Sequence, residues 1–553
     1  MRLFPMISRH GRCLLARAGG ALAITLLLAG CGDNYRPIIT PVYSNGPEPQ
    51  PAAYAIVVSS TGASKPGVVS IVDYSGDSIL SSSSFSVGGI KAGPVAFTLD
   101  SIGGTGFTLN TDNTLTNFNI NTTGQWANNI LISTVSPSSQ IVNLMAPSTG
   151  LWTTDLNGDA VDLFSGSPEA FKEAVPVASS GTAPTMPVFI AGASSFSGQR
   201  EYVVSQNQPD LTGQTFCNNP ANFTAAPNGW LTPIEITTDT ADPPIATGKC
   251  PVYAVQTPDL QRMFVLNRGD DTLTVLNTNI NALDQCTPHL GQSGNWVTCH
   301  PVIPLSLNAV AAIGAPWNGT AGMTTTAGPV YAEYNAATQQ LVVADYDGGT
   351  ISVIDVPIDE YGDDSNTYTN STCATYAACG AITGGFGTIH TIQVGNTTHP
   401  NPASVTVLND GSKAYTANQN DDSSGNGTGS GTVSVVNLST YTVEKTIPVA
   451  GHPRTVVNIQ NSEYAKIYAV SPDSPYLAII ESSPTITDQI DTELLLQGYP
   501  IDVRTTSQNG ASGNNNYSSR VPGYGQPCNL SDQQLTARGY LGALTLAECE
   551  AQQ

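Results

Sequence analysis

Histidine is the residue type in this 553-residue chain that is best suited to acid–base or metal chemistry, and it is scarce. Five histidines follow the first thirty residues, and two of them recur as His399-Pro400 and His452-Pro453, each directly before a strand-like run. Neutral imidazoles that meet at one place bind transition metals or act as bases. We therefore take His399 and His452 as candidate metal ligands. The favoured alternative is that both are turn residues beside a proline that the backbone requires.

A second set of side chains has the alternating oxygen spacing of a calcium loop. This set is Asp155, Asn157, Asp159 and Asp162. Ala160 stands where such a loop needs glycine, and the twelfth position is Gly166 in place of glutamate. A hairpin turn at Asn157-Gly158 therefore explains the pattern better than bound calcium does.

Motifs of known reactions are missing from the sequence. Arg268-Gly269-Asp270 spells an adhesion tripeptide, but it falls at a predicted hairpin turn, where the backbone favours Gly and Asp. No GxSxG nucleophile, HExxH pair or phosphate loop is present. We therefore favour a binding protein over an enzyme and expect no cofactor, with a transition metal or calcium as the alternatives.

Eight cysteines follow Cys31, and each has a sequence neighbour within the same long insertion or within the C-terminal tail. No CxxC spacing of a metal site occurs, and an exported chain enters an oxidising compartment. We therefore predict four disulfides, with sequential pairing as the simplest arrangement. The candidates are Cys217, Cys250, Cys286, Cys299, Cys373, Cys379, Cys528 and Cys549.

Three long insertions, 209–250, 283–327 and 357–385, are the candidate binding loops. Long loops closed by disulfides on a rigid scaffold are where binding usually resides. If the three gather on one face, that face is the predicted binding surface; the alternative is that they have no function. The candidate binding residues are Trp230, Trp296, Trp317, Asp359, Glu360, Asp363 and Asp364.

The first thirty residues have the composition of a secretory leader. They contain four arginines, no acidic residue and an apolar run at 21–29 that is too short to span a bilayer. The run ends in Leu28-Ala29-Gly30-Cys31, which resembles the lipobox of bacterial lipoproteins. The resemblance implies cleavage before Cys31 and acylation of this residue, with chains such as palmitate. An ordinary signal peptide is the alternative, and the choice between outer membrane and periplasmic face stays open.

The charge balance of the chain excludes one class of partner. Without the four leader arginines, 15 basic residues face 42 acidic ones, which leaves a net charge of about −27. Phosphate backbones and anionic headgroups are repelled by such a surface, so we expect no nucleic-acid partner. Contact with a membrane is expected through the lipid anchor alone, and an envelope protein or a glycan is the expected ligand.

Four segments of the chain can be laid over one another. Each is a hairpin of two alternating apolar runs around a Gly, Asp or Asn turn, and each follows a Pro-led strand. Four short strands in about 45 to 50 residues form the blade of a β-propeller. The hairpins begin at Arg262, Gln340, Lys413 and Lys466, and the Pro-led strands begin at Pro251, Pro329, Pro402 and Pro453.

The runs TISVIDVP and KAYTANQ are similar to the motifs of the YVTN β-propeller family, and the resemblance covers residues 54–504. It implies a single all-β propeller and says little about function, because the family includes binding, surface-layer and lactonase-like members. Weaker units begin at Pro94, Ser139 and Pro187.

The predicted ring closes through the two ends of the chain. Three strands between Tyr54 and Gly88 lack an inner strand, which PIDVRTT at Pro500 supplies, so that no free sheet edge remains at the seam. The count is then eight blades. Seven is the alternative, because the unit at Ser139 is the least regular.

These features divide the chain into a leader at 1–30, a flexible tether at 31–53, the propeller at 54–507 and a linker with a helical tail at 508–553. Ser531 and Thr545 are placed as helix N-caps in this tail, which a disulfide between Cys528 and Cys549 would close.

Our leading hypothesis from the sequence is a lipid-anchored binding or scaffolding module of the cell envelope. A lactonase-like or metal-dependent hydrolase with a site at the axial channel is the alternative. A purely structural envelope component is a third hypothesis.

Overall fold

The computed structural model describes most residues from Ala53 to Thr506. The gaps within this range are 63–64, 85–92, 101–103, 112–113, 121–125, 135–138, 147–149, 167–168, 178–185, 193–199, 208–216, 218–219, 237, 243, 258–261, 278–301, 307–326, 357–387, 398–399, 422–430, 462–463 and 485. The predicted leader, Cys31, the tether and the C-terminal tail lie outside the described residues.

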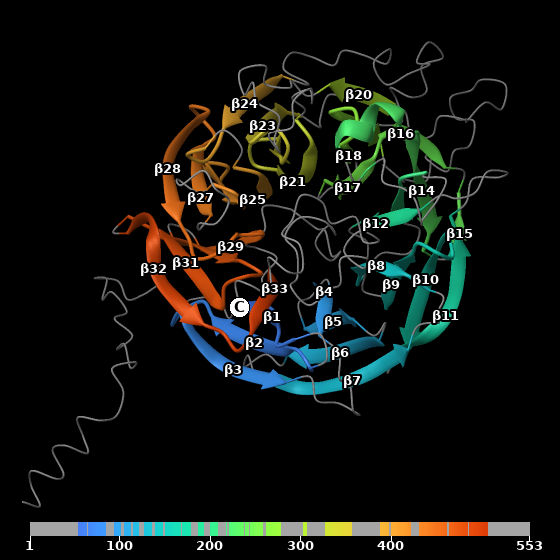
Figure 1. The fold of residues 1–553 in the computed structure, drawn as a ribbon, viewed down its shortest axis with the longest axis horizontal. Helices are drawn as coiled ribbons and strands as arrows, with labels where there is room; N and C mark the ends of the chain where they lie inside the picture. Colours follow the sequence, from blue (N-terminus) through green and yellow to red (C-terminus); the bar gives the residue numbers. More distant parts are fainter. Residues whose placement is uncertain are drawn as a thin grey trace, which may run out of the picture. The chain divides into compact units, whose positions relative to one another are not determined.

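The described residues form eight β-sheets arranged as a ring, the β-propeller shown in Figure 1. We name the blades A to H and give their strands from the axis outward. Blade A consists of β33 (Tyr499–Thr505), β1 (Tyr54–Ser60), β2 (Val68–Asp73) and β3 (Ser78–Ser84). Blade B consists of β4 (Pro94–Leu99), β5 (Thr105–Asn110), β6 (Thr114–Ile120) and β7 (Trp126–Thr134). Blade C consists of β8 (Ile141–Met145), β9 (Leu151–Asp155), β10 (Ala160–Gly166) and β11 (Glu169–Pro176).

Blade D departs from the four-strand pattern. It consists of β12 (Pro187–Ala191), β13 (Arg200–Ser205) and β14 (Asn228–Glu235), and β14 pairs with both β15 (Thr240–Ala241) and β16 (Ile245–Lys249). A short 3-10 helix, η1 (Pro220–Ala225), lies between β13 and β14. No helix within the described part of the chain is long and apolar enough to cross a membrane.

The remaining blades repeat the four-stranded pattern. Blade E consists of β17 (Pro251–Gln256), β18 (Arg262–Asn267), β19 (Thr272–Asn277) and β20 (Val302–Ser306). Blade F consists of β21 (Pro329–Asn335), β22 (Gln340–Asp345), β23 (Thr350–Asp355) and β24 (Ile389–Gln393). Blade G consists of β25 (Pro402–Val407), β26 (Lys413–Asn418), β27 (Thr432–Asn437) and β28 (Thr442–Pro448). Blade H consists of β29 (Thr455–Asn461), β30 (Tyr464–Val470), β31 (Tyr476–Ser482) and β32 (Thr487–Leu495).

The two ends of the propeller meet in blade A. β1 pairs antiparallel with β33, with Val57 opposite Val503. The ladder continues beyond the strands, because the Tyr54 N–H donates to Thr506 Oγ1 at 3.0 Å and the Thr506 N–H donates to the Tyr54 carbonyl at 2.9 Å. The predicted closure and the count of eight blades are confirmed. The unit at Ser139 is a complete blade, so the seven-bladed alternative is wrong.

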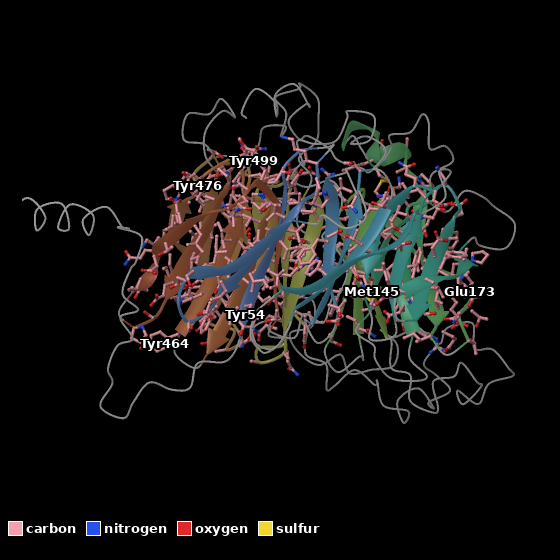
Figure 2. The ribbon with its side chains drawn as sticks, turned by 90° about the horizontal axis from the view of Figure 1, so that it is seen from below. Tyr54, Met145, Glu173, Tyr464, Tyr476 and Tyr499 are labelled. Atoms are coloured by element: carbon pink, nitrogen blue, oxygen red, sulfur yellow. A yellow bond between two sulfur atoms is a disulfide. The ribbon has the colours of Figure 1, made fainter. Side chains whose placement is uncertain are left out.

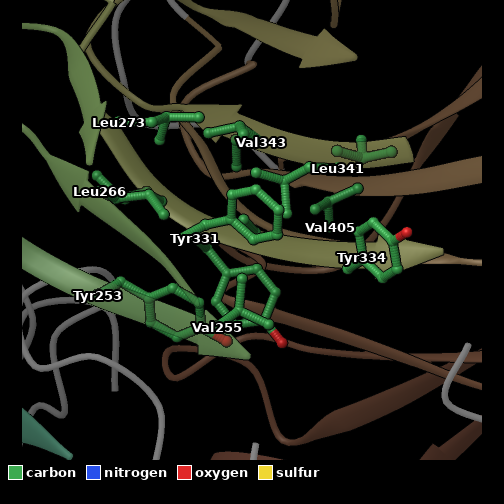
Figure 3. Packing of buried hydrophobic residues seen from close by; sticks show 14 of the residues in the cluster. Tyr253, Val255, Leu266, Leu273, Tyr331, Tyr334, Leu341, Val343 and Val405 are labelled. Atoms are coloured by element: carbon green, nitrogen blue, oxygen red, sulfur yellow. The ribbon is translucent and has the colours of Figure 1, made fainter. Parts of the chain in front are cut away.

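Aromatic and aliphatic side chains fill the space between adjacent blades. Every residue of β17, β21 and β25 is buried, because neighbouring blades cover both faces of an inner strand. Phe189, Tyr253 and Tyr331 come from blades D, E and F. The ring centroids of Phe189 and Tyr253 are 4.7 Å apart, and those of Tyr253 and Tyr331 are 4.8 Å apart. Figure 3 shows Tyr253 and Tyr331 within this cluster. Such contacts make the ring a rigid scaffold.

The ring has two faces with different connections. The crossover face carries the connections from one blade to the next and the hairpins between second and third strands. The opposite face carries the other two hairpins of each blade. Figure 2 views the ring from the side, with Tyr476 and Tyr499 at the crossover edge and Tyr54 and Tyr464 at the opposite edge.

The three insertions leave the sheets on both faces. The chain leaves β13 and returns at β14 on the crossover face. It leaves β19 for β20, and β23 for β24, on the opposite face, because both are connections between third and fourth strands. The second insertion also continues from β20 to β21, a connection between blades, and so returns on the crossover face. The chain therefore enters the insertions on both faces, and their gathering into one binding surface stays a prediction, because most of their residues lie outside the described ones.

Candidate functional site

A repeated carboxylate lies in the hairpins of the crossover face. In four blades, an aspartate at the end of the second strand or in the hairpin that follows it accepts a backbone N–H from the segment that enters the same blade. The pairs are Asp155 with Gln140 at 2.8 Å, Asp270 with Lys249 at 3.0 Å, Asp421 with Asn396 at 2.5 Å, and Asp473 with His452 at 2.7 Å. Ionised acceptors make strong hydrogen bonds to such N–H groups. The acidic residues of these four turns are visible in the sequence, where turn chemistry alone explains them.

His452 is held by one of these carboxylates. Its Nδ1 lies 2.5 Å from Asp473 Oδ2, and the histidine side chain is 12% exposed. Burial alone would raise the pKa of Asp473, but the hydrogen bonds and charge of His452 outweigh it and lower this pKa below its ordinary value. In the neutral ring, a proton on Nδ1 directed at the carboxylate places the lone pair on Nε2. This is the tautomer of a histidine that acts as a base or as a metal ligand, although Nε2 itself is buried in this structure.

The second predicted histidine, His399, lies outside the described residues, so the convergence of the pair stays a prediction. Blade G presents the equivalent carboxylate, Asp421, which accepts the Asn396 and Thr397 N–H groups at 2.5 and 2.7 Å. Within the described residues, no three His, Cys, Asp or Glu side chains form a group that could hold a metal ion.

The candidate calcium residues form the hairpin between β9 and β10. Asp155 Oδ1 accepts from the Gln140 and Asn157 N–H groups, and Asp159 Oδ1 accepts from the Met186 N–H at 2.9 Å. Asp162 lies on β10, and burial together with the charge of Asp155 raises its pKa to about 6. The hairpin turn preferred from the sequence is present, and backbone donors occupy carboxylate oxygens that a calcium ion would need.

Arg268 of the adhesion-like tripeptide points into the protein. Its side chain is 0% exposed, and Nε and Nη2 donate to Asp347 Oδ2 and Oδ1 at 2.8 and 2.6 Å. The guanidinium carbon lies 5.6 Å from the ring centroids of both Phe223 and Tyr346. A buried arginine cannot be recognised from outside, so Arg268-Gly269-Asp270 joins blades E and F and is no adhesion site.

The first insertion is fastened to the ring beside Arg268. Cys217 and Cys250 form a disulfide with a Cα–Cα distance of 5.2 Å, as predicted. Both cysteines, Phe223 and Ala226 form a small buried cluster of their own. The Cys250 carbonyl accepts the Arg268 N–H at 3.1 Å, which connects the cluster to blade E.

Only one of the other predicted binding residues is described. Trp230 lies on β14 at the base of the fastened insertion, half-buried and opposite Ser205 on β13. The remaining candidates lie outside the described residues: Trp296, Trp317, Asp359, Glu360, Asp363, Asp364, Cys286, Cys299, Cys373, Cys379, Cys528 and Cys549.

Polar side chains of several inner strands join neighbouring blades. They donate to, or accept from, groups of the next inner strand around the axis. In three of these bonds a backbone N–H of the next blade donates to the side chain: Ile190 to Asn143 Oδ1 at 3.0 Å, Val407 to Glu333 Oε1 at 3.2 Å, and Val456 to Ser404 Oγ at 3.0 Å. These groups therefore stabilise the ring, a role that the sequence pattern did not reveal.

Comparisons with known proteins identify the fold. No protein-family model matches the chain, and no curated protein matches its sequence. The structure is similar to dihydro-heme d1 dehydrogenase NirN in complex with DHE, at 11% identity over 85% of this chain and 77% of that one, with a TM-score of 0.51.

Two further similar structures are AztD from Citrobacter koseri and a putative 6-phosphogluconolactonase from Bacteroides fragilis. AztD is 10% identical over 82% of this chain and 97% of its own, with a TM-score of 0.47. The lactonase-like protein is 14% identical over 83% of this chain and 99% of its own, with a TM-score of 0.44. At such identities the likeness shows the β-propeller fold alone.

Proposed function

We propose that this protein is a lipid-anchored binding or scaffolding module of the cell envelope, attached through Cys31, that engages an envelope protein or a glycan through its crossover face. The fastened insertion carries this proposal. A disulfide, the Phe223 cluster and the buried Arg268 hold a surface loop in one position on a rigid ring. Holding a loop in its bound conformation lowers the entropy cost of binding.

Site-specific photo-crosslinking tests the binding face. Thr224 is exposed on η1 at the crossover face, and Asp410 is exposed in a hairpin of the opposite face, so the two are matched positions for a p-benzoylphenylalanine probe. With solubilised cell envelope, we expect a product from the Thr224 probe that excess unlabelled mature protein suppresses, and none from the Asp410 probe. Equal products from both probes, or none, would overturn the choice of this face.

Membrane anchoring is tested separately. We expect the wild-type chain to fractionate with membranes and to carry acyl chains on Cys31 by mass spectrometry of the N-terminal peptide. Cys31→Ala should release the protein from membranes without changing the crosslink at Thr224. Membrane association that survives Cys31→Ala would contradict the lipid anchor and leave the binding face untouched.

The Asp473–His452 pair favours a second candidate function, a metal-dependent hydrolase. The pair orients an imidazole on the same face, and a metal there would polarise a carbonyl or activate a water. Elemental analysis of the mature protein, repeated on His399→Ala/His452→Ala, decides between the two. About one transition metal per chain that vanishes in the double variant would support the hydrolase, whereas a metal-free wild type would reject it.

A further inference from the structure

The last position of the second strand is occupied by the same residue type in three blades. It is Asn110 in blade B, Asn267 in blade E and Asn418 in blade G. In blades E and G, the amide Nδ2 donates to two hydroxyl groups of the third strand. The acceptors are Thr272 and Thr274 at 3.0 and 2.9 Å, and Thr432 and Ser434 at 3.0 and 2.8 Å.

Blade C ends its second strand with Asp155, whose Oδ1 accepts two backbone N–H groups. Blade F ends its second strand with Asp345. Its Oδ2 accepts from Ser352 Oγ at 2.6 Å and from Thr350 Oγ1 at 3.2 Å. Its Oδ1 has no hydrogen-bond partner among the described residues, and the side chain is 0% exposed. An ionised carboxylate buried with one oxygen unsatisfied is strongly unfavourable.

The first hydroxyl group of the third strand has a different acceptor in blade F from the one it has in blades E and G. In blades E and G, the first hydroxyl of the third strand donates onward to the hairpin carboxylate, from Thr272 to Asp270 at 2.7 Å and from Thr432 to Asp421 at 2.6 Å. Blade F has Gly348 at that hairpin position, so Thr350 donates back to Asp345.

The charges around Asp345 oppose its ionisation. Asp347 on the same hairpin and Asp271 on the β18–β19 hairpin are the acids that face it, and the only guanidinium among the neighbours described, that of Arg268, is paired with Asp347. The ladder partner on β21 is Pro329, which has no titratable group. Burial first, and then these two negative charges, raise the pKa of Asp345 to about 8.

Asp271 strengthens this effect from blade E. Burial raises its own pKa to about 6, so it is ionised at neutral pH. Its Oδ1 accepts the Gly328 N–H at 2.9 Å. Gly328 has a φ of +60°, and a Cβ there would lie 2.0 Å from Asp347 Oδ2, so the acids are packed tightly.

We propose that Asp345 is held as a neutral carboxylic acid at neutral pH, in the place that asparagine takes in blades B, E and G, and that its ionisation in alkaline solution loosens the junction of blades E and F. The proton goes to solvent, and one negative charge is added beside Asp271 and Asp347. The first insertion rests on this junction, because Phe223 contacts Arg268 and the Arg268 N–H donates to Cys250. The stability of this part of the crossover face therefore depends on the proton of Asp345.

Infrared spectroscopy tests the protonation state directly. Between about pH 7 and pH 10 we expect the wild type to lose one protonated-carboxyl C=O band, because a proton leaves a carboxyl group in this range. The band should be missing from Asp345→Asn, which keeps the shape and a neutral side chain. A wild-type spectrum without such a band, or a band that persists in the variant, would overturn the proposal.

Equilibrium unfolding tests the consequence for stability. A carboxyl whose folded pKa is raised stabilises the protein fully below its unfolded pKa, and this contribution is lost as the pH rises through its folded pKa. Relative to Asp345→Asn, the unfolding constant of the wild type should rise about tenfold per pH unit between about pH 4 and pH 8 and then level off. Asp345→Asn that is less stable than the wild type at about pH 9 would overturn the proposal.

Amide exchange and a matched variant distinguish loosening from a general loss of stability. The Arg268 and Tyr346 N–H groups lie on the two sides of the junction, where they donate to the Cys250 and Gly328 carbonyls of their own blades. Corrected for intrinsic rates, their exchange should accelerate above about pH 8 in the wild type and not in Asp345→Asn. Asp421→Asn, which weakens the hydrogen bonds from the Asn396 and Thr397 N–H groups in blade G, should unfold more readily than the wild type at neutral pH. Equal acceleration in Asp345→Asn would refute the junction's dependence on this proton.

Discussion

Blades F and H each have a carboxylate in the hairpin between their second and third strands, on the crossover face, but the two carboxylates have different partners. Asp347 pairs with Arg268 of the preceding blade, and both side chains are fully buried. Asp473 pairs with His452 in the segment that enters its own blade, and the histidine side chain is 12% exposed. Arginine keeps its charge at all accessible pH values, whereas histidine changes charge near neutrality. The same hairpin can therefore hold a permanent ion pair or a histidine, depending on where its carboxylate lies: Asp347 is two residues, and Asp473 three residues, beyond the end of the second strand.

The largest expected effect comes from breaking the permanent ion pair. Arg268→Ala leaves Asp347 buried without a counter-ion, next to Asp271, and should cost about 3–5 kcal/mol of unfolding free energy. Denaturant titration measures this loss. The double variant Arg268→Met/Asp347→Leu removes both charges and should recover most of the stability. A single variant within about 1 kcal/mol of the wild type would show that the pair contributes little.

Removing the disulfide tests the attachment of the first insertion to the same junction. The disulfide joins residues 33 positions apart and so restricts the conformations of the unfolded chain. Cys217→Ser/Cys250→Ser removes this restriction and should lower the free energy of unfolding by about 2–4 kcal/mol. Faster proteolysis at 206–227, compared with the hairpins of blade G, would locate the change. An unchanged unfolding midpoint would mean that the Phe223 cluster alone secures the insertion.

The smallest effect is expected at the Asp473–His452 pair. Asp473→Asn weakens the bonds to His452 and should cost about 1–3 kcal/mol at neutral pH. The pKa of Asp473 is lowered by folding, so its contribution is present above the ordinary carboxyl pKa of about 4 and is lost as the pH falls through the lower folded pKa. Stability curves of wild type and variant should therefore converge in acid. A difference that stays constant down to about pH 2 would argue against an ionised Asp473.

Local patterns in the sequence were sufficient for most of the fold. Alternating apolar residues and Gly, Asp or Asn turns predicted the blades, and the unpaired strands near Tyr54 predicted closure by the run at Pro500. The Cys217–Cys250 pair also followed from sequence proximity. These features depend on neighbours a few residues apart, or on a strand that lacks its partner, and so they can be read along the chain.

The candidate site was decided by the tertiary structure. Arg268 meets Asp347 from 79 residues away, and Asp345 of blade F is fully buried beside Asp271 of blade E. The insertions leave the sheets on two faces because a connection between second and third strands lies on the crossover face, whereas one between third and fourth strands lies on the opposite face. By itself, the sequence determined the strands, their turns and the closure of the ring. Which charges were buried together depended on the packing of successive blades, because burial and electrostatic interaction act between residues that only the closed ring brings into contact.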